Sequence, residues 1–300
     1  MARVSKFRNV FGVDFSGAKL AGRNTWIAHV ELTPRGPRLC DLASLETLGG
    51  YADRERALPA LVAAIVRSRD AVWAMDFPFA LPIEIVPRRH SFDDQLRAVA
   101  RWPNEAYSLG LDCVRRTREH HARRPKRRRG GGGGDNGAKL HIRRLTDRET
   151  RTPFDCYHYR IIYQTFHGMR DVLLPLRGHA PATAILPFDY GRLPLARSVV
   201  IESCPGSTLR RLGWPHNNYK QPTGGPLTPT RRRTRREILD RLLGHVAIEP
   251  RHQRVIMRNP GADALDAVLA TLAPALRWQA YDHPAIGGHA RYAREGYVYT

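Results

Sequence analysis

The sequence has few cysteines and no long apolar segment. None of its four cysteines forms a Cys-x-x-Cys pair, so a zinc ribbon or a thioredoxin-type redox site has no support. Isolated thiols of this kind predict a protein of the reducing cytoplasm. No apolar run reaches the ~18 residues that a membrane span needs. No hydrophobic segment follows the basic residues Arg3, Lys6 and Arg8, so we expect neither a secretory signal nor a membrane partner.

Acidic residues are also scarce, with 28 acidic against 49 basic side chains and a formal net charge of +21. Such an excess favours polyanionic partners, above all nucleic acid. An arginine-rich composition with one basic loop explains the same charge, because net charge reports on association and not on fold. The charge therefore leaves DNA and RNA equally open, and the sequence gives no sign of the oligomeric state.

The apolar pattern predicts an α/β fold with a mixed sheet. The length of 300 residues and the apolar fraction of 42% suit a single large domain over residues 1–300. Two closely spaced strands imply an antiparallel hairpin or meander, and the helical spacing that follows them predicts a helix with Asp53 as its N-cap. We expect strands at 9–15, 25–32, 37–46, 71–77 and 198–203, and this first helix at 53–69.

Most of the remaining chain reads as helix and loop. The segment 153–177 has the strongest helical spacing, and Asn259 followed by Pro260 predicts the start of the last helix. Residues 214–230 are rich in proline, glycine and threonine and are expected to form a loop. We expect the helices at 93–118, 153–177, 207–212, 231–243 and 260–276.

An Arg/Gly-rich segment interrupts the helices. It runs from Arg123 through five consecutive glycines, and it cannot bury enough apolar surface to become ordered. We predict that residues 119–140 are disordered and that they belong to a largely helical insertion spanning 84–180. This segment serves either as a tether that binds phosphates or as a solvated loop between two helices.

Several acidic residues sit at the edges of apolar segments. Carboxylates without His or Cys nearby suit Mg²⁺ or Mn²⁺ rather than zinc, and close carboxylates repel one another unless cations lie between them. Two such ions ~3.5–4 Å apart are a known arrangement for phosphodiester hydrolysis. The acids in question are Asp14, Asp76, Glu202, Asp263 and Asp266.

Each of these acids has a plainer explanation when taken alone. Asp14 precedes a Ser-Gly turn, which Asp favours, and Asp263 suits the positive end of a helix. Asp76 and Glu202 follow strongly apolar runs, where a buried acid must be paired or functional. The combination is therefore a stronger signal for a metal site than any single member.

Six motifs are spread along nearly the whole chain. They are Gly-Val-Asp-Phe-Ser-Gly-Ala at 12–18, Met-Asp-Phe-Pro-Phe-Ala-Leu-Pro at 75–82, Arg-Arg-Leu-Thr-Asp-Arg-Glu-Thr-Arg-Thr-Pro-Phe at 143–154, Gln-Thr-Phe-His-Gly at 164–168, Ile-Glu-Ser-Cys-Pro-Gly-Ser-Thr-Leu at 201–209 and Ala-Asp-Ala-Leu-Asp-Ala at 262–267. In these motifs and in their order, the chain resembles the predicted ribonuclease H-like (RNase H-like) nucleases catalogued as domain of unknown function 429.

The resemblance implies a ribonuclease H-like fold, in which helices flank a five-stranded mixed sheet. It implies a metal site with Asp14 on the first strand, Asp76 on the fourth and Glu202 on the fifth. Asp263 or Asp266 on the last helix would complete the site. We hypothesise a nuclease that uses Mg²⁺ or Mn²⁺, with Asp14, Asp76, Glu202 and Asp266 as catalytic residues. Ser16, Lys19 and Arg211 are the expected phosphate contacts.

Two other functions stay open. A non-catalytic nucleic-acid-binding protein on the same fold would bind with strong salt dependence and without metal-dependent turnover. An actin-like or sugar-kinase-like ATP-binding enzyme shares the core of this superfamily, and residues 14–17 loosely resemble its phosphate turn. That enzyme needs a duplicated domain and a second glycine-rich phosphate loop, neither of which is visible in the sequence.

Overall fold

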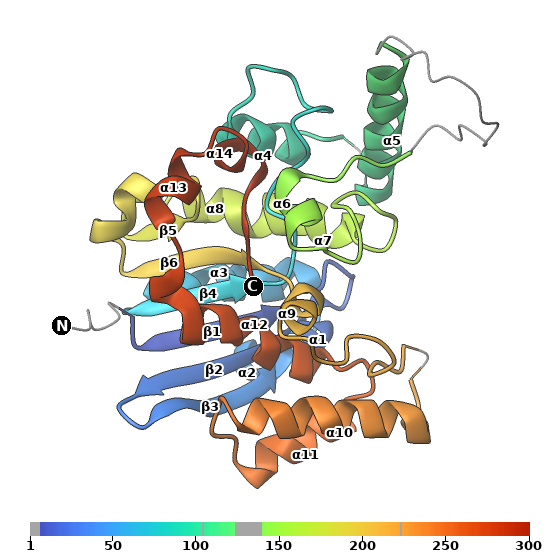
Figure 1. The fold of residues 1–300 in the computed structure, drawn as a ribbon. Helices are drawn as coiled ribbons and strands as arrows, with labels where there is room; N and C mark the ends of the chain where they lie inside the picture. Colours follow the sequence, from blue (N-terminus) through green and yellow to red (C-terminus); the bar gives the residue numbers. More distant parts are fainter. Residues whose placement is uncertain (1–6, 104, 124–139, 223) are drawn as a thin grey trace.

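A mixed sheet of seven strands organises the chain in the computed structural model, which describes residues 7–103, 105–123, 140–222 and 224–300 (Figure 1). The strand order is β3-β2-β1-β4-β6-β5, and β7 lies beside β6. Strands β1, β2 and β3 are antiparallel neighbours, whereas β1, β4, β6, β5 and β7 run parallel. The strands are β1 (Asn9–Asp14), β2 (Trp26–Thr33), β3 (Gly36–Ser44), β4 (Ala71–Met75), β5 (Thr183–Ile185), β6 (Ser198–Ser203) and β7 (Val298–Tyr299).

The mixed α/β sheet is confirmed, but the predicted number of strands is too small. The five expected strands are present as β1, β2, β3, β4 and β6, and the described residues add β5 and β7. Strand β5 has three residues and β7 has two. Segments this short cannot show the alternation by which strands are recognised in a sequence.

Fourteen α-helices surround the sheet in the described part of the chain. They are α1 (Ala21–Asn24), α2 (Leu45–Gly49), α3 (Arg54–Arg67), α4 (Phe92–Ala100), α5 (Ala106–Ala122), α6 (Leu145–Glu149), α7 (Ile162–His167), α8 (Leu174–Arg177), α9 (Pro205–Arg211), α10 (Pro229–Leu243), α11 (Pro250–Arg258), α12 (Asp263–Arg277), α13 (His283–Gly288) and α14 (Tyr292–Glu295). None of these helices is long and apolar enough to cross a bilayer.

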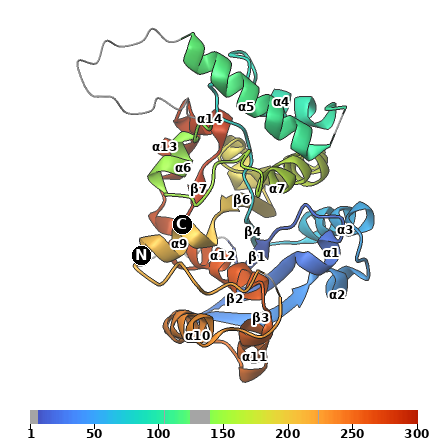
Figure 2. The same cartoon turned by 90° about the vertical axis from the view of Figure 1, so that its right-hand side faces the viewer.

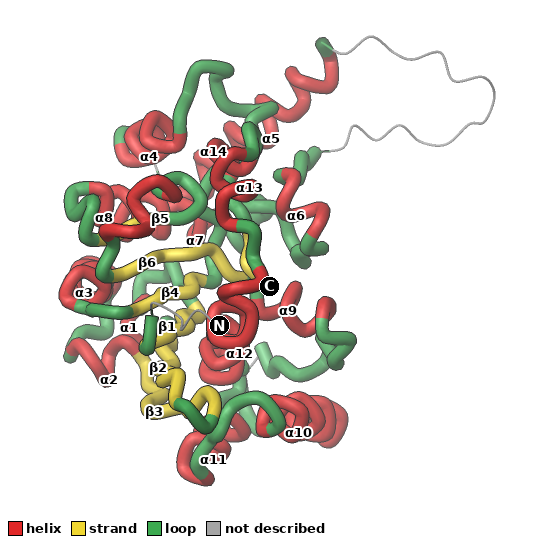
Figure 3. The backbone as a smooth tube through the Cα atoms, turned by 60° about the vertical axis from the view of Figure 1, so that its left-hand side comes forward, coloured by secondary structure: helices red, strands yellow, loops and turns green. Residues whose placement is uncertain are grey.

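Helices cover both faces of the sheet. Figure 3 shows α1, α2 and α3 on one side of the strands, and α9, α10 and α12 on the other. Side chains alternate along each strand, so Val13 and Met75 pack on the α3 side, whereas Val10 and Ala74 face α12. Figure 2 shows α4 and α5 gathered at one end of the molecule and α10 and α11 at the other.

Helix α12 lies against β1 at a position without a side chain. A Cβ atom placed on Gly12 would stand 2.0 Å from the carbonyl oxygen of Ala267. Only glycine allows a strand and a helix to approach so closely. This contact sets α12 across the middle of the sheet, with its N-terminus near the end of β1 (Figure 1).

The helix predicted over 153–177 is shorter and less regular than expected. Residues 153–161 form turns, and helix begins only at Ile162, where α7 leads through the π-helical segment Gly168–Leu173 into α8. Tyr159, one of the residues whose spacing suggested this helix, is 61% exposed. A side chain at Gly168 would lie 2.4 Å from the Phe77 ring, so this part of the helix packs closely against the strand β4 region.

Other predictions of helices also differ from the structure, and the helix expected over 93–118 is divided into α4 and α5. Helix α12 begins at Asp263 rather than at 260, because Ala262 has a left-handed backbone (φ 69°) that no helix interior accepts. Asn259 is therefore not the N-cap, although its side-chain oxygen accepts a hydrogen bond from the Ala264 amide at 3.4 Å. The segment predicted to be disordered lies mostly outside the described residues, and α5 continues to Ala122 within its predicted range.

Candidate carboxylate site at the ends of the parallel strands

A cavity of about 480 Å³ lies where β1, β4 and β6 end. The carboxyl ends of parallel strands in an α/β sheet meet at one edge, and ligands generally bind in the crevice beyond that edge. Asp14 is the last residue of β1, and Asp76 follows β4 directly. Four of the predicted acids line this cavity together: Asp14, Asp76, Glu202 and Asp266.

Of these four acids, Asp14 and Asp76 have the fewest polar partners. Neither carboxylate accepts a hydrogen bond or forms an ion pair with any side chain or amide that the structure describes. Burial raises the pKa of Asp14 well above its ordinary range, although the nearby Lys220 lowers it again in part. Burial and the neighbouring charge of Asp266 raise the pKa of Asp76 to about 7. A cation placed between these carboxylates would restore their ionised form.

Asp266 occupies the same cavity from the first turn of α12. Its side chain is buried, and Oδ1 accepts a hydrogen bond from the Tyr219 hydroxyl at 3.1 Å. The ammonium of Lys220 contacts Oδ2. Both partners come from the loop between α9 and α10, which the sequence predicted only as a loop. Asp266 therefore already has a positive partner, unlike Asp14 and Asp76.

Glu202 reaches the cavity but does not belong with the other three acids. The β4–β6 register pairs it with Met75, whose side chain faces the α3 side of the sheet. Its Oε2 accepts hydrogen bonds from Arg144 Nη1 at 2.9 Å and from the Phe79 amide at 3.1 Å, and Arg144 Nη2 contacts Oε1. Both oxygens of Glu202 therefore already have partners, and its role as a metal ligand stays a prediction.

Arg144 is the centre of a buried network of hydrogen bonds and ion pairs, which was not predicted from the sequence. It donates from Nε to Asp147 Oδ2 at 3.0 Å and from Nη1 to the Glu295 carbonyl at 2.9 Å. Burial alone would lower the pKa of Arg144, but the charges of Asp147 and Glu202 raise it well above its ordinary value. The signal was present in the motif at 143–154, which the resemblance singled out without giving its residues a role.

The remaining predicted residues lie away from the cavity wall. Asp263 is close enough for its charge to raise the pKa of Asp14, but it does not line the cavity. None of the three expected phosphate contacts lines the cavity either, and Ser16 Oγ instead accepts from the Ala18 amide at 3.3 Å. Those three residues are Ser16, Lys19 and Arg211. The cationic residues that do line the cavity are Arg144, Arg160, Arg210, Lys220 and Arg231.

The donor set fits a divalent metal only in part. Carboxylate oxygens from β1, β4 and α12 converge, which suits Mg²⁺ or Mn²⁺. Among the residues that the structure describes, however, no three His, Cys, Asp or Glu side chains are arranged as a ready metal-binding group. The ammonium of Lys220 contacts one oxygen of Asp266, so that oxygen already has a cationic partner.

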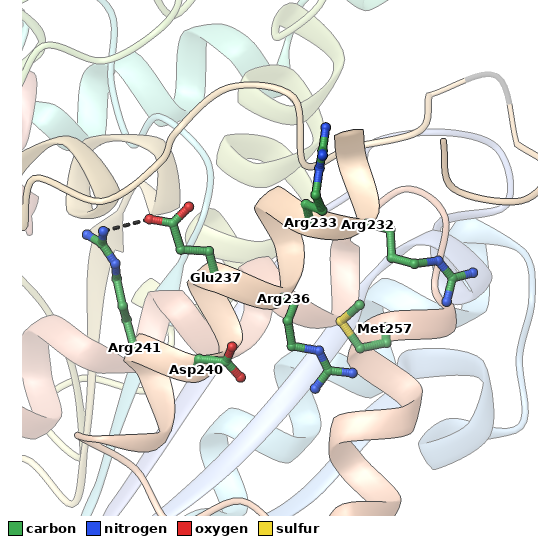
Figure 4. A pocket seen from close by; sticks show the side chains of 7 residues that line it. All are labelled: Arg232, Arg233, Arg236, Glu237, Asp240, Arg241 and Met257. Carbon is green, nitrogen blue, oxygen red and sulfur yellow. Dashed lines mark hydrogen bonds and ion pairs between the residues drawn. The ribbon is translucent and has the colours of Figure 1, made fainter. Parts of the chain in front are cut away.

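A separate hollow of about 700 Å³ lies on the outer side of α10 (Figure 4). Arg232, Arg233 and Arg236 are exposed there and have no carboxylate partner in the described part of the chain, whereas Arg241 pairs with Glu237. The preceding residue, Arg231, lines the carboxylate cavity. The first two turns of α10 thus join the cavity to an arginine-rich surface.

Comparisons with known proteins do not settle the family. No family model, no curated protein and no solved structure matches this chain. The assignment of a function therefore depends on the geometry described above.

Proposed function

We propose that this chain is a nuclease that hydrolyses phosphodiester bonds with the help of Mg²⁺ or Mn²⁺. The observation that carries the proposal is the convergence of Asp14, Asp76 and Asp266 on one cavity from three separate elements. These residues are 62 and 190 positions apart along the chain, so their convergence is a property of the fold and not of one acidic stretch. Clustered, poorly solvated carboxylates with raised pKa values are typical of functional sites.

The fold supports a ribonuclease H-like assignment. Three antiparallel strands followed by parallel β4 and β6, in the order β3-β2-β1-β4-β6, have the arrangement that the resemblance implies, with β5 and β7 as additions. Asp14 then ends the first strand, Asp76 directly follows the fourth, and Asp266 lies in the first turn of α12, which two short helices follow. The described residues form one sheet, so they lack the duplicated core that the ATP-binding alternative requires.

Asp14, Asp76 and Asp266 are the residues that would hold the metal. A divalent ion at such a site supplies a nucleophilic water at neutral pH and stabilises charge on the departing oxygen. Arg160, Arg210 and Arg231 line the same cavity and carry the charge needed to position a phosphodiester. Because the cationic residues surround the acids, substrate phosphate and metal would occupy one compartment.

A direct assay tests the proposal. Purified protein is incubated with labelled single-stranded, duplex, hybrid and branched DNA and RNA in Mn²⁺ or Mg²⁺, and products are separated on denaturing gels. Asp14→Asn and Asp76→Asn should each lower the rate by at least about a hundredfold. Asp70→Asn is the matched control, since Asp70 is exposed at the other end of β4 and its φ of 49° suits Asn. Activity that survives Asp14→Asn contradicts the proposal.

A non-catalytic nucleic-acid-binding protein is the second candidate. It is favoured by the ion pairs of Glu202 with Arg144 and of Asp266 with Lys220, which balance two of the acids without a metal. In that case the wild-type protein binds nucleic acid but produces no cleavage with either metal. Binding would then be unchanged in Asp14→Asn, which separates the two candidates.

A further inference from the structure

The carboxylate cluster of Asp14, Asp76, Asp263 and Asp266 has a single cationic partner among the described residues, which is Lys220. The contact joins Nζ to Oδ2 of Asp266, a carboxylate that is almost fully buried. Its charge also acts on Asp14, Asp76 and Asp263. Burial would lower the pKa of Lys220, but Asp266, Tyr219 and Asp14 raise it well above its ordinary value. The four acids therefore share one ammonium.

The backbone that carries Lys220 is firmly held. Arg235 on α10 is buried and donates to the Tyr219 carbonyl from Nε at 3.0 Å and from Nη2 at 2.6 Å. The same guanidinium donates to the Pro260 carbonyl at 2.9 Å, and the Gln221 amide donates to that carbonyl at 2.8 Å. The residues on both sides of Lys220 are therefore tied to the turn that leads into α12.

The side chain of Lys220, in contrast, has a route to solvent. It is 46% exposed as a whole, although its ammonium touches a buried oxygen. A lysine side chain has four rotatable bonds and can move its charged end while the backbone stays fixed. Tyr219, which donates to the other oxygen of Asp266, is 5% exposed and has no such freedom.

We propose that Lys220 is a built-in counter-ion that occupies the carboxylate cluster in the metal-free protein and leaves Asp266 when a divalent cation binds. The inference rests on the proposed metal-dependent function of the cluster. In the absence of metal, the ammonium reduces the repulsion between the carboxylates. Because Lys220 and the metal compete for the same oxygen of Asp266, the ammonium also lowers the affinity of the cluster for metal. Once released, the ammonium stays at the rim of the cavity, where it can contact a phosphate.

The first test measures Mn²⁺ binding by isothermal titration calorimetry in the full chain. Lys220→Met should bind Mn²⁺ about tenfold more tightly than wild type and should melt at a lower temperature in EDTA. Lys220→Arg keeps the charge and should not bind more tightly. Arg35→Met is the matched control, since it removes one positive charge from the exposed turn between β2 and β3 and should leave the affinity unchanged.

The second test needs no substitution. Reductive methylation of lysines followed by mass spectrometry should label Lys220 several times faster when Mn²⁺ is present, while Lys19, which is exposed in both conditions, serves as the internal reference. Two results would overturn the counter-ion role and leave the nuclease proposal standing. One is unchanged or weaker Mn²⁺ binding in Lys220→Met, and the other is a labelling rate of Lys220 that does not change with Mn²⁺. A wild-type protein that binds no Mn²⁺ at millimolar concentration overturns both.

Discussion

Arg144 donates hydrogen bonds from two guanidinium nitrogens to the two carboxylate oxygens of Glu202, and both side chains are buried. The pair joins the start of α6 to the end of β6, and Asp147 completes it as a second acid. Glu202 is therefore part of a buried ion-pair network in the cavity wall. If either Arg144 or Glu202 were removed, the other would remain as a buried charge without this partner.

The first prediction concerns this ion pair. Arg144→Met leaves Glu202 and Asp147 buried without a counter-charge, so the free energy of unfolding should fall by about 3–5 kcal/mol. Urea denaturation followed by circular dichroism measures the change. Arg115→Met, which removes an exposed ion pair with Asp112, is the control and should cost less than about 1 kcal/mol. Equal losses in the two variants would contradict the structural role of Arg144.

The second prediction concerns pH. The pKa of Asp76 is raised to about 7, whereas an Asp in the unfolded chain ionises near 3.9. The folded state therefore favours the protonated form, and its stability falls as the pH rises from about 4 through 7 in EDTA. Asp76→Asn removes this loss, so it should melt about 7 °C above wild type at pH 8 and level with it near pH 4.

Thermal melts at several pH values in EDTA check this result. Asp70→Asn serves again as the control, and its difference from wild type should not change with pH in the same range. A difference between Asp76→Asn and wild type that is constant from pH 4 to pH 8 would show that Asp76 ionises normally.

The third prediction concerns the arginine surface on α10. Replacing Arg232, Arg233 and Arg236 with Gln should weaken binding of all nucleic-acid sequences to a similar extent. Each lost phosphate contact lowers the slope of log affinity against log salt by about 0.9 on duplex DNA, so the triple variant should lower it by about 2–3. Fluorescence anisotropy over a salt series measures the slope.

The matched control replaces three arginines that lie at the opposite end of the sheet. Arg35, Arg67 and Arg69 are exposed near the start of β1, on the side away from Asp14. The two triple variants have the same net charge, so a general charge effect would change both slopes equally. Only a larger change in the α10 variant supports this surface as the binding face.

The fourth prediction separates the two acids of α12. Asp266 lines the cavity, whereas Asp263 does not. Asp266→Asn should therefore abolish Mn²⁺ binding detectable by calorimetry, and Asp263→Asn should weaken it by no more than about tenfold, through loss of a nearby charge. The reverse ranking would assign the ligand role to Asp263.

The positions of Asp14 and Asp76 were predictable because they follow from strand order. An apolar run that ends in an acid places that acid at the edge of the sheet, and the parallel strands β1 and β4 bring two such edges together. The helical position of Asp266 was also predictable, because residues three apart, such as Asp263 and Asp266, lie on one face of a helix. The side of the sheet to which Glu202 points could not be predicted. It depends on the β4–β6 register, which the local sequence does not encode.

Lys220 and Arg144 could not be predicted for a different reason. Both lie in irregular segments without a period, and each meets its partner across a long stretch of chain, 46 residues from Lys220 to Asp266 and 58 from Arg144 to Glu202. Arg144 lies in the motif at 143–154, but nothing in the local sequence assigns a partner to it or to Lys220. Because the chain has so many basic residues, composition alone could not single out Arg144 and Lys220 as the partners of Glu202 and Asp266.

The close approach of Gly12 to Ala267 has a consequence for the whole site. Asp14 lies two residues beyond Gly12, and Asp266 immediately precedes Ala267, so the separation of the two acids is set where main chain touches main chain. A single methyl group at residue 12 has no room, and it would push the helix away from the strand and part the two carboxylates.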